Sequence, residues 1–395
     1  MVGIDTVAIA NSAKEAGYKI YAADYFGDMD LQRVCSGWKA ILKQRHGKSC
    51  GKIGSRFKPE AFLKMTKSLV QKHEIDGILL SSGLDSFSDL LYKLNDLVPI
   101  LGNPPEIIKR IQEEQYSFQE LDSLGINHPE TAVAESLEEA EGAAEKIGCP
   151  VVVKPIRSLG GSGIRIARNS EEMRRTFLGM SLSNEKVLIQ SLIDGIHASV
   201  SFISTDTKTE VLTMNEQLLG IPYLFQHEPF GYCGNIVPLW LPRSLSEKCS
   251  SITEKIASHF NLTGSNGIDL IISEEGIPYV VEINPRFQGT LECVNRVLGI
   301  NLVKSHMNAC LHCSLPKVEQ KTSIFCSRLV LYAPKRVVAP NLNVYREVRD
   351  IPLPGTIIEK REPLCSVLTE GKSRKLSFTE ARRLAESIYG ILRPA

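Results

Sequence analysis

The first hundred residues alternate between helical and strand-like hydrophobic patterns. Residues 12–17 have the composition of a helix end, whereas residues 18–25, 77–82 and 98–101 are short apolar runs typical of buried strands. Short apolar strands separated by helical segments are typical of a parallel sheet flanked by helices. The pattern therefore predicts a small parallel α/β layer at the start of the chain.

A second unit begins at Pro104 and Pro105, because prolines can open a helix at its first turn but cannot lie inside one. The helical pattern that follows continues to Leu124. Further along, Ser136 and Glu139 have the spacing of a capping box. They predict the start of another helix.

The rest of the chain is dominated by strand patterns. Residues 186–200 and 268–284 are apolar and β-rich, and a helical pattern over residues 247–260 separates them, which is typical of an α+β unit. From about Phe325 the chain has short strand patterns, and it finishes with a helix that we expect to begin at its capping residue Ser377. We divide the chain into residues 1–110, the α/β layer; 111–189, which carry the glycine-rich segment described below; 190–315, the α+β unit; and 316–395, a β-rich module ending in a helix.

The composition narrows the class of protein. A chain of 395 residues exceeds what one hydrophobic core organises, which agrees with several structural units. With a formal net charge of only +1, the chain lacks the excess of basic residues that attracts the phosphate backbone of nucleic acids. No apolar run approaches the roughly 20 residues of a membrane span. We therefore expect a soluble, cytoplasmic protein with no nucleic-acid or membrane partner.

Ten cysteines are scattered through apolar segments, which favours reduced, buried thiols over a disulfide framework. Cys310 and Cys313 form one CxxC pair, with His312 inside it and Cys326 further along, and such a set could ligate zinc. Because no second pair follows at zinc-finger spacing, structural thiols are the preferred interpretation.

Residues 158–163, Ser-Leu-Gly-Gly-Ser-Gly, lie between two apolar strand patterns and so occupy the tip of a hairpin. Their glycines allow the backbone to approach an anion closely and to present several amide donors, as a triphosphate requires. A flexible hairpin without a ligand is the alternative. Lys154 ends the preceding strand, where a partly desolvated ammonium needs an anionic partner, either a phosphate oxygen or a neighbouring carboxylate.

Two acidic residues on a second predicted hairpin form the sharpest pattern. A turn at residues 274–276 places Asp269 opposite Glu282, with Asn284 on the same face as Glu282. Opposed carboxylates repel each other unless a cation lies between them, and Mg²⁺ bound to phosphate supplies one. A hydrated strand face is the alternative, but the flanking apolar residues favour a covered one. Arg286 could clamp a phosphoryl group or a substrate carboxylate, or form a surface salt bridge.

The order of these features resembles that of the ATP-grasp enzymes. They are Lys154, residues 158–163, the run Leu-Ile-Gln-Ser-Leu-Ile at 188–193, Asp269, Glu282, Asn284 and Arg286. The chain looks like a predicted ATP-dependent carboligase related to biotin carboxylase and to the large chain of carbamoyl phosphate synthase, and the similarity covers nearly the whole chain. The resemblance implies a mixture of α/β and α+β architecture. An ATP-grasp fold would be preceded by a small parallel α/β domain, like the N-terminal domain of biotin carboxylase, and followed by a small β-rich C-terminal module.

The resemblance also implies ATP and Mg²⁺ as cofactors, with Mn²⁺ as an alternative metal. Lys154 and Arg286 would be the catalytic residues, with Lys154 at the adenine side and α-phosphate and Arg286 at the transferred phosphate. The glycine-rich segment would cover the β- and γ-phosphates, the backbone at Leu192 and Ile193 would read the adenine edge, and Gln190 would face the adenine amino group. The implied nucleotide ligands are Lys154, Ser158, Gly160, Gly161, Ser162, Gly163, Gln190, Leu192, Ile193 and His197, and the implied metal ligands are Asp269, Glu282 and Asn284.

The chain departs from the family at one position. The family usually has a lysine that contacts ATP a short way before the glycine that is Gly125 here, and this chain has no lysine at that place. Glu114 and Gln115 occupy that neighbourhood. Either Lys109 or another cation substitutes, or the triphosphate has one contact fewer. Weaker candidates, each with a structural alternative, are His197 near the ribose or phosphates, residues 230–238 in the acceptor pocket, and Glu292 beside a substrate amine.

The resemblance implies an ADP-forming ligase that joins a carboxylate to an amine or thiol through an acyl phosphate. Its partners would be small-molecule carboxylates and amines, with a homodimer as the candidate assembly. One alternative is an enzyme that activates bicarbonate to carboxyphosphate, with biotin on a separate carrier because the chain has no Ala-Met-Lys-Met attachment site. The other is an ATP-binding module without catalysis.

Overall fold

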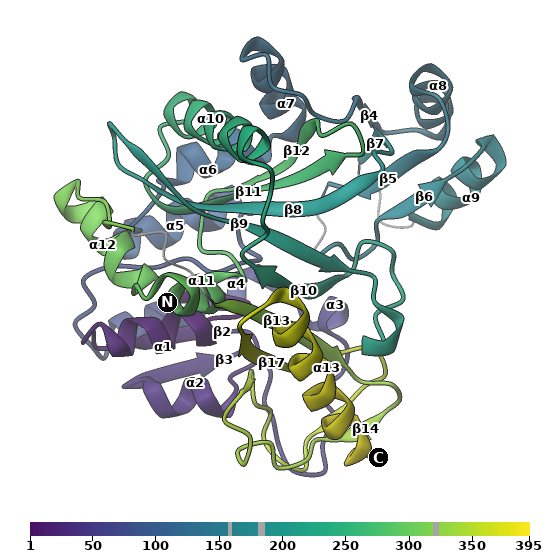
Figure 1. Ribbon diagram of the computed structural model, residues 1–395. Coiled ribbons are helices and arrows are strands. Elements are labelled where there is room, and N and C mark those ends of the chain that lie inside the picture. Colours follow the sequence, from purple (N-terminus) through teal and green to yellow (C-terminus); the bar gives the residue numbers. More distant parts are fainter. Residues whose placement is uncertain (157–159, 181–185, 319–323) are drawn as a thin grey trace.

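The N-terminal layer contains the parallel sheet that the hydrophobic pattern predicts. In the computed structural model, which describes residues 1–156, 160–180, 186–318 and 324–395, its strands follow the order β1 (Val2–Gly3), β2 (Tyr21–Asp24) and β3 (Gly37–Ala40) (Figure 1). Two expected strands are reduced to isolated parallel bridges, Val2 with Leu80 and Ile78 with Ile100. The helices of this layer are α1 (Val7–Glu15), α2 (Met29–Val34), α3 (Ile53–Arg56), α4 (Pro59–Val70) and α5 (Ser88–Leu97).

The long helix expected after the two prolines is divided into α6 (Pro105–Gln112) and α7 (Glu114–Ser123). Glu113 between them has φ −75° and ψ 72°, outside the helical region, so the expectation of one continuous helix is wrong. A tertiary contact accompanies the break. Arg110 Nε donates to Glu120 Oε1 at 2.9 Å, and the imidazole of His259 contacts the other carboxylate oxygen.

The predicted glycine-tipped hairpin is part of a small antiparallel sheet in the order β4 (Thr131–Ala134), β7 (Val187–Ser191), β5 (Val151–Pro155) and β6 (Arg165–Ala167). Helices α8 (Leu137–Ile147) and α9 (Ser170–Met180) accompany it (Figure 1). The predicted capping box is confirmed, because Ser136 Oγ accepts from the Glu139 amide at 3.2 Å. The Glu139 carboxylate in turn accepts from the Glu135 amide at 2.7 Å.

A large antiparallel sheet forms the centre of the molecule (Figure 1). Its strands run in the order β12 (Pro278–Asn284), β11 (Gly264–Ser273), β8 (Gly195–Ser204), β9 (Thr209–Leu219), β10 (Tyr232–Val237), β13 (Phe325–Tyr332), β17 (Pro363–Gly371) and β15 (Val348–Arg349). The strands of the C-terminal module therefore extend the sheet of the preceding unit. The remaining elements are η2 (Pro222–Leu224), α10 (Arg243–His259), α11 (Leu291–Leu298), α12 (Leu302–His312), α13 (Arg374–Gly390) and a small sheet of β16 (Ile357–Ile358), β14 (Val337–Val338) and β18 (Arg393–Pro394).

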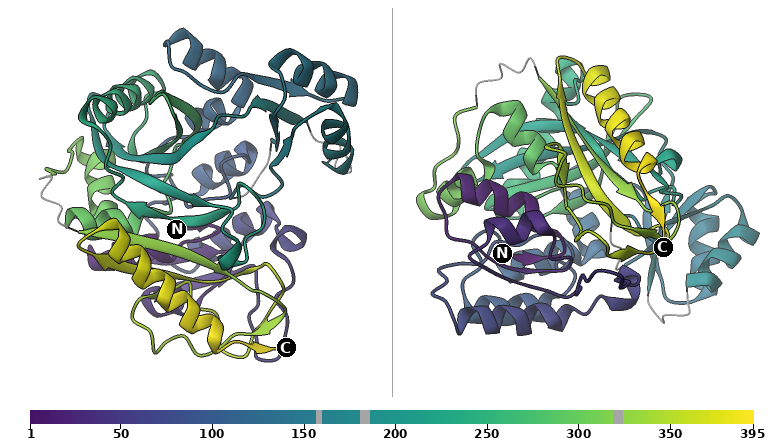
Figure 2. Two further views of the ribbon diagram at one scale, coloured as in Figure 1. Left: turned by 45° about the vertical axis from the view of Figure 1, so that its right-hand side comes forward. Right: turned by 90° about the horizontal axis from the view of Figure 1, so that it is seen from below.

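The C-terminal helix α13 lies along strands β13 and β17, as both views of Figure 2 show in yellow. It begins one turn earlier than the capping pattern predicts. Ser373 is the N-cap and its hydroxyl accepts from the Leu376 amide at 3.2 Å. Ser377, the predicted cap, is instead fully buried and hydrogen-bonds Ser327 on β13 at 2.8 Å. Burial against the sheet, and not helix capping, explains this serine.

The described residues add two facts about metals and membranes. All ten cysteines are free thiols, and among the described residues no three His, Cys, Asp or Glu side chains are grouped to hold a metal ion. Within the same part of the chain, every helix is too short or too polar to cross a bilayer.

His306 on α12 joins the N-terminal layer to the large sheet. The Ser265 amide donates to Nδ1 at 2.8 Å, and Nε2 donates to the Leu101 carbonyl oxygen at 2.9 Å. Burial lowers the pKa of His306 from 6.5 to about 4, because an imidazolium would be poorly solvated there.

We expect this histidine to make folding stability fall as the pH drops from about 6.5 to about 4. In that range the unfolded chain binds a proton at His306 that the folded protein does not, which favours unfolding by about 3 kcal/mol over the whole window. Urea unfolding of the wild type and of His306→Gln across this range measures the effect. The difference between the two free energies of unfolding should change by that amount, and a pH-independent difference would contradict a buried neutral imidazole.

Candidate active site

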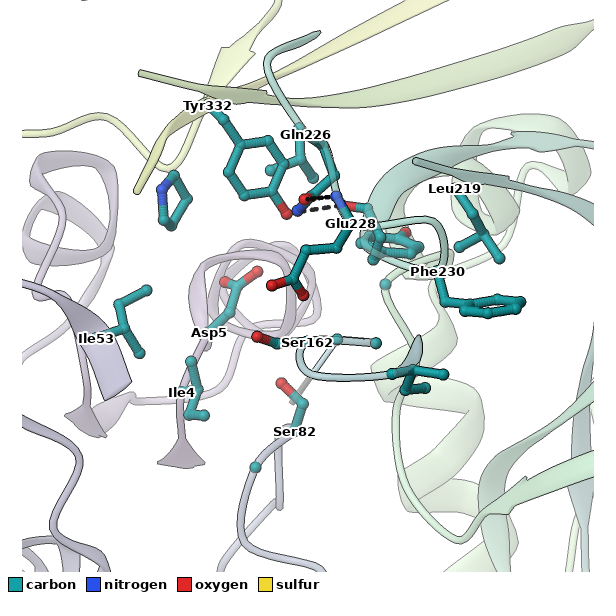
Figure 3. Close-up of a pocket in the computed structure, with 18 of the residues that line it drawn as sticks. Ile4, Asp5, Ile53, Ser82, Ser162, Leu219, Gln226, Glu228, Phe230 and Tyr332 are labelled. Atoms are coloured by element: carbon teal, nitrogen blue, oxygen red, sulfur yellow. Dashed lines mark hydrogen bonds between the residues drawn. The ribbon is translucent and has the colours of Figure 1, made fainter. Parts of the chain in front are cut away.

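A cavity of about 1210 Å³ lies where the N-terminal layer, the small antiparallel sheet and the large sheet meet (Figure 3). Most of the predicted site residues line it although they come from separate elements. They are Lys154, Gly160, Gly161, Ser162, Gln190, Leu192, Ile193, His197, Asp269, Glu282, Asn284 and Arg286. Gly163 borders a separate shallow pocket, and Ser158 lies outside the described residues.

The two predicted acidic residues are cross-strand partners. Strands β11 and β12 pair Asp269 with Glu282 and Gly267 with Asn284, and the register shifts directly after Asp269. Asp269 Oδ1 is buried and has no hydrogen-bond partner among the described residues. Burial, and secondly repulsion from Glu282, raise the pKa of Asp269 to about 7. A pair of carboxylates in this condition has the oxygen donors and the excess negative charge that suit a divalent cation.

Arg286 lines the cavity beside the predicted metal ligands, and protein groups hold its guanidinium. Its side chain is only 14 % exposed and is therefore no surface salt bridge, yet its donors are already engaged. Nε donates to Asp85 Oδ2 at 2.5 Å, and the guanidinium also donates to Asn284 Oδ1 and to the Phe287 carbonyl oxygen, each at 3.0 Å. Asp85 comes from the N-terminal layer, so this buried ion pair joins that layer to the predicted metal site.

The predicted adenine end of the cavity is formed by β5, β7 and the start of β8. Lys154 is almost fully buried on β5, and Leu192 and Ile193 follow β7 directly. Gln190 Nε2 donates to Thr131 Oγ1 at 3.0 Å, which leaves its Oε1 as the acceptor. His197 is half-buried on β8, where burial lowers its pKa. His197 also lines the cavity.

The described part of the glycine-rich segment packs against residues 226–232. The Gly163 amide donates to Glu228 Oε2 at 2.9 Å, and the Tyr232 amide donates to the Gly160 carbonyl oxygen at 3.0 Å. Gly161 has φ +75°, and a Cβ added there would lie 1.9 Å from the Phe230 carbonyl oxygen. Both conditions require glycine. The expected close approach of backbone at these glycines is thus present, with protein backbone as the near neighbour.

Of the three weaker candidates, the segment 230–238 contributes residues to the cavity wall, whereas Glu292 and Lys109 do not. Phe230, Tyr232 and Asn235, from the segment proposed for the acceptor pocket, line the cavity. Glu292 does not line it and forms an ion pair with Arg349 at 2.8 Å, which favours its structural interpretation. Lys109 is half exposed, lies 3.9 Å from Glu113, and is also absent from the cavity wall.

Arg328 and Asp350 line the cavity but were not recognised from the sequence. The Arg328 side chain is only 4 % exposed, and its guanidinium donates to Asp350 Oδ2 at 2.8 Å and to Asp5 Oδ2 at 3.2 Å. The sequence does contain an indication of this site. Arg328 lies inside the otherwise apolar strand Phe325–Tyr332, where a buried arginine needs an anionic partner.

Comparisons with known proteins support the resemblance. Residues 112–290 match the family model described as an ATP-grasp domain. An uncharacterized protein of Methanocaldococcus jannaschii is 26% identical over 391 residues, which are 98% of this chain and 91% of that protein. The carbamoyl phosphate synthase large chain of Helicobacter pylori is 28% identical over 260 residues, which are 63% of this chain and 23% of that protein. The matched residues therefore span under a quarter of the length of that synthase.

Two solved structures show the shared fold. Biotin carboxylase from Campylobacter jejuni has a TM-score of 0.73 at 15% identity, covering 96% of this chain and 88% of the other. An L-amino acid ligase from Bacillus licheniformis has a TM-score of 0.72 at 15% identity, covering 99% and 96%. Both agree with the predicted architecture of an ATP-grasp fold with a parallel α/β layer before it and β-strands after it.

Proposed function

We propose that this protein, which carries an ATP-grasp domain, is an ADP-forming ligase that uses ATP and Mg²⁺ to join a carboxylate to an amine or thiol. The observation that carries the proposal is the opposed pair of Asp269 and Glu282 inside the cavity that also contains Lys154 and the glycine-rich segment. That combination provides oxygen ligands for a divalent cation beside donors for phosphate.

The residues present fit a bound Mg²⁺. Asp269 Oδ1 is buried without a hydrogen-bond partner among the described residues, and burial, followed by repulsion from Glu282, raises the pKa of Asp269 to about 7. Asp269, Glu282 and Asn284 would hold Mg²⁺, or Mn²⁺ in its place. When bound, the metal would neutralise phosphate charge and fix the triphosphate against these side chains.

The nucleotide ligands would divide between the two ends of the cleft. Lys154 and the amides of the glycine-rich segment would contact the phosphates, with His197 near the ribose or phosphates. The free Oε1 of Gln190 would accept from the adenine amino group, since its Nε2 is already bound to Thr131. The backbone at Leu192 and Ile193 would complete the adenine site.

The chemistry requires the donor carboxylate to become a better acyl donor. Its oxygen attacks the γ-phosphorus of ATP, ADP leaves, and the acyl phosphate then reacts with the amine while phosphate leaves. The chain would contribute alignment of the two reactants, positive charge from Lys154 at the α-phosphate and from Arg286 at the transferred phosphoryl group, and exclusion of water by the glycine-rich segment.

The proposal is tested by a screen of carboxylic acids with amines for ADP and phosphate release in the presence of Mg-ATP. Release that requires both an acid and an amine supports ligation. Release with bicarbonate alone supports the second candidate, a carboxyphosphate-forming enzyme, which the shared fold with biotin carboxylase favours. A rise in melting temperature with Mg-ATP but no ADP under any condition would identify a binding module and overturn the proposal.

Gly161→Ala should raise the KM for ATP by about tenfold or more, because the added Cβ forces a strained positive φ and displaces the segment from the Phe230 carbonyl. The measurement is steady-state ADP formation as a function of ATP concentration. Gly142→Ala is the matched control, since a Cβ at that helical glycine meets nothing within 4 Å. An unchanged KM in Gly161→Ala would show that this segment does not contact the nucleotide.

A further inference from the structure

Residues 220–231, which connect β9 to β10, form a loop whose own hydrogen bonds fix its shape. The Gly220 amide donates to the Gly231 carbonyl oxygen at 2.8 Å, so the two ends of the loop are joined. Between them, the Tyr389 hydroxyl of α13 donates at 3.1 Å to the carbonyl oxygen of Leu224, whose side chain is fully buried. The loop is thus attached to the large sheet and to the C-terminal helix, and we call it the support loop.

Glu228 connects the support loop to residues 160–163, the described part of the glycine-rich segment. One oxygen of its carboxylate, Oε2, accepts from the Gly163 amide at 2.9 Å. The other, Oε1, accepts from the Arg165 guanidinium at 3.3 Å. Figure 3 shows the Glu228 side chain pointing toward the part of the segment that carries Ser162. A single side chain of the large sheet therefore holds both the segment and the start of the strand that follows it.

The described part of the segment is held at both of its ends. The Gly160 carbonyl oxygen accepts from the Tyr232 amide at 3.0 Å, and the Gly163 amide is bound to Glu228. Ser162, which lies between these two attachments, lines the large cavity, whereas Gly163 borders the separate shallow pocket. Gly163 is therefore an attachment point in this arrangement, and phosphate contacts are left to the rest of the segment.

The environment of Glu228 differs from that of the predicted metal ligands. Asp269 has a buried oxygen without a partner among the described residues, whereas each oxygen of Glu228 accepts from a protein donor. A carboxylate near a triphosphate is unfavourable unless its charge is offset, and the Arg165 guanidinium offsets it. Glu228 is thus better suited to holding the segment than to binding a metal ion.

An ordinary surface ion pair is the alternative role of Glu228. The side chains of Arg165 and Glu228 are 43% and 31% exposed, and exposed ion pairs contribute little to stability. The bond from the Gly163 amide distinguishes the two roles, because it joins the pair to a segment of the cavity. A hydrogen bond to an ionised carboxylate is also stronger than one between neutral groups.

We propose that Glu228 is a positioning residue, which holds residues 160–163 against the support loop so that they meet the β- and γ-phosphates of ATP at a fixed place. This inference rests on the proposed function, in which the segment contacts those phosphates. Glu228 acts through Gly163. The adenine end of the cavity is formed by β5, β7 and the start of β8, so loss of Glu228 should weaken the phosphate contacts and spare the adenine contacts.

The test is calorimetric titration of the protein, with Mg²⁺ present, using AMP and the imido analogue of ATP, in which nitrogen bridges the β- and γ-phosphorus. Glu228→Ala should weaken binding of the analogue by about tenfold or more and change that of AMP by less than about twofold. Glu228→Gln keeps an oxygen for the Gly163 amide but not the charge that pairs with Arg165, so it should recover part of the lost affinity.

Glu141→Ala is the matched control. Glu141 lies on α8, its carboxylate forms an ion pair with Arg174 at 2.9 Å, and its side chain is likewise 31% exposed. It is not among the described residues that line the cavity. This variant should bind both nucleotides as the wild type does.

Two results would overturn the positioning role. Equal weakening of AMP and of the analogue in Glu228→Ala would show that Glu228 supports the cavity as a whole. Unchanged affinity for the analogue would show that the contact with Gly163 is an ordinary surface interaction.

The failure of this inference can be told apart from failure of the ligase proposal, because the titrations require no turnover. Selective loss of the analogue in Glu228→Ala, without ADP formation by the wild type from any acid, would support the positioning role and overturn the ligase. Ligation by Glu228→Ala at an unchanged KM for ATP would support the ligase and overturn the positioning role.

Discussion

Asp269→Ala and Glu282→Ala are each expected to lower the rate of ATP turnover by about 100-fold or more. The two carboxylates are paired across β11 and β12, and either one alone leaves a divalent cation with too few anionic ligands in the cavity. The measurement is ADP formation at saturating ATP over a range of Mg²⁺ concentrations. The loss of turnover should persist at high Mg²⁺ concentration, because each variant lacks a metal ligand and its low turnover is not due to incomplete occupancy of the metal site by Mg²⁺.

The same variants should not be less stable in the absence of nucleotide. The folded pKa of Asp269 is about 7 against 3.8 for an unperturbed aspartate, so this carboxyl group destabilises the metal-free protein increasingly as the pH rises from about 4 to about 7. Asp269→Ala removes that pH-dependent loss. Glu274→Ala, an exposed position in the turn of the same hairpin, is the control for both activity and stability. Full turnover in both variants would show that the metal assignment is wrong.

Local patterns predicted the parts of the site that depend on local geometry. The register of Asp269 against Glu282 follows from one turn and from alternation along two strands, and the structure confirms it. The glycine-tipped hairpin follows in the same way, with Val151 paired to Ala167. The capping box at Ser136 is confirmed for the same reason, since its partners are only three residues apart.

Contacts between distant segments could not be predicted in this way. Asp85 and Arg286 are 201 positions apart, and Asp5 and Arg328 are 323 apart, so neither pair belongs to any local pattern. The break between α6 and α7 was not predicted either. Helical periodicity continues through it, but the observed backbone at Glu113 leaves the helix where Arg110 reaches the buried Glu120 carboxylate. Tertiary contacts of this kind override local propensity.

Arg286→Ala is expected to lower both stability and turnover. It leaves Asp85 buried without its cation, which costs about 3 kcal/mol of the free energy of unfolding. It also removes the positive charge nearest to the predicted metal ligands, with a loss of turnover of about 100-fold or more. Arg286→Lys keeps the charge but cannot donate at once to Asp85, Asn284 and the Phe287 carbonyl, so it should recover stability only in part. Urea unfolding and ADP formation are measured on the same preparations.

A double-mutant cycle separates the two effects of Arg286. Asp85→Asn removes the charge that Arg286→Ala would leave buried, so the double variant Asp85→Asn, Arg286→Ala should regain most of the stability lost in Arg286→Ala alone. Turnover should stay low in the double variant if the guanidinium acts on the transferred phosphoryl group. If turnover returns together with stability, Arg286 serves only to attach the N-terminal layer to the large sheet and does not act on the transferred phosphoryl group.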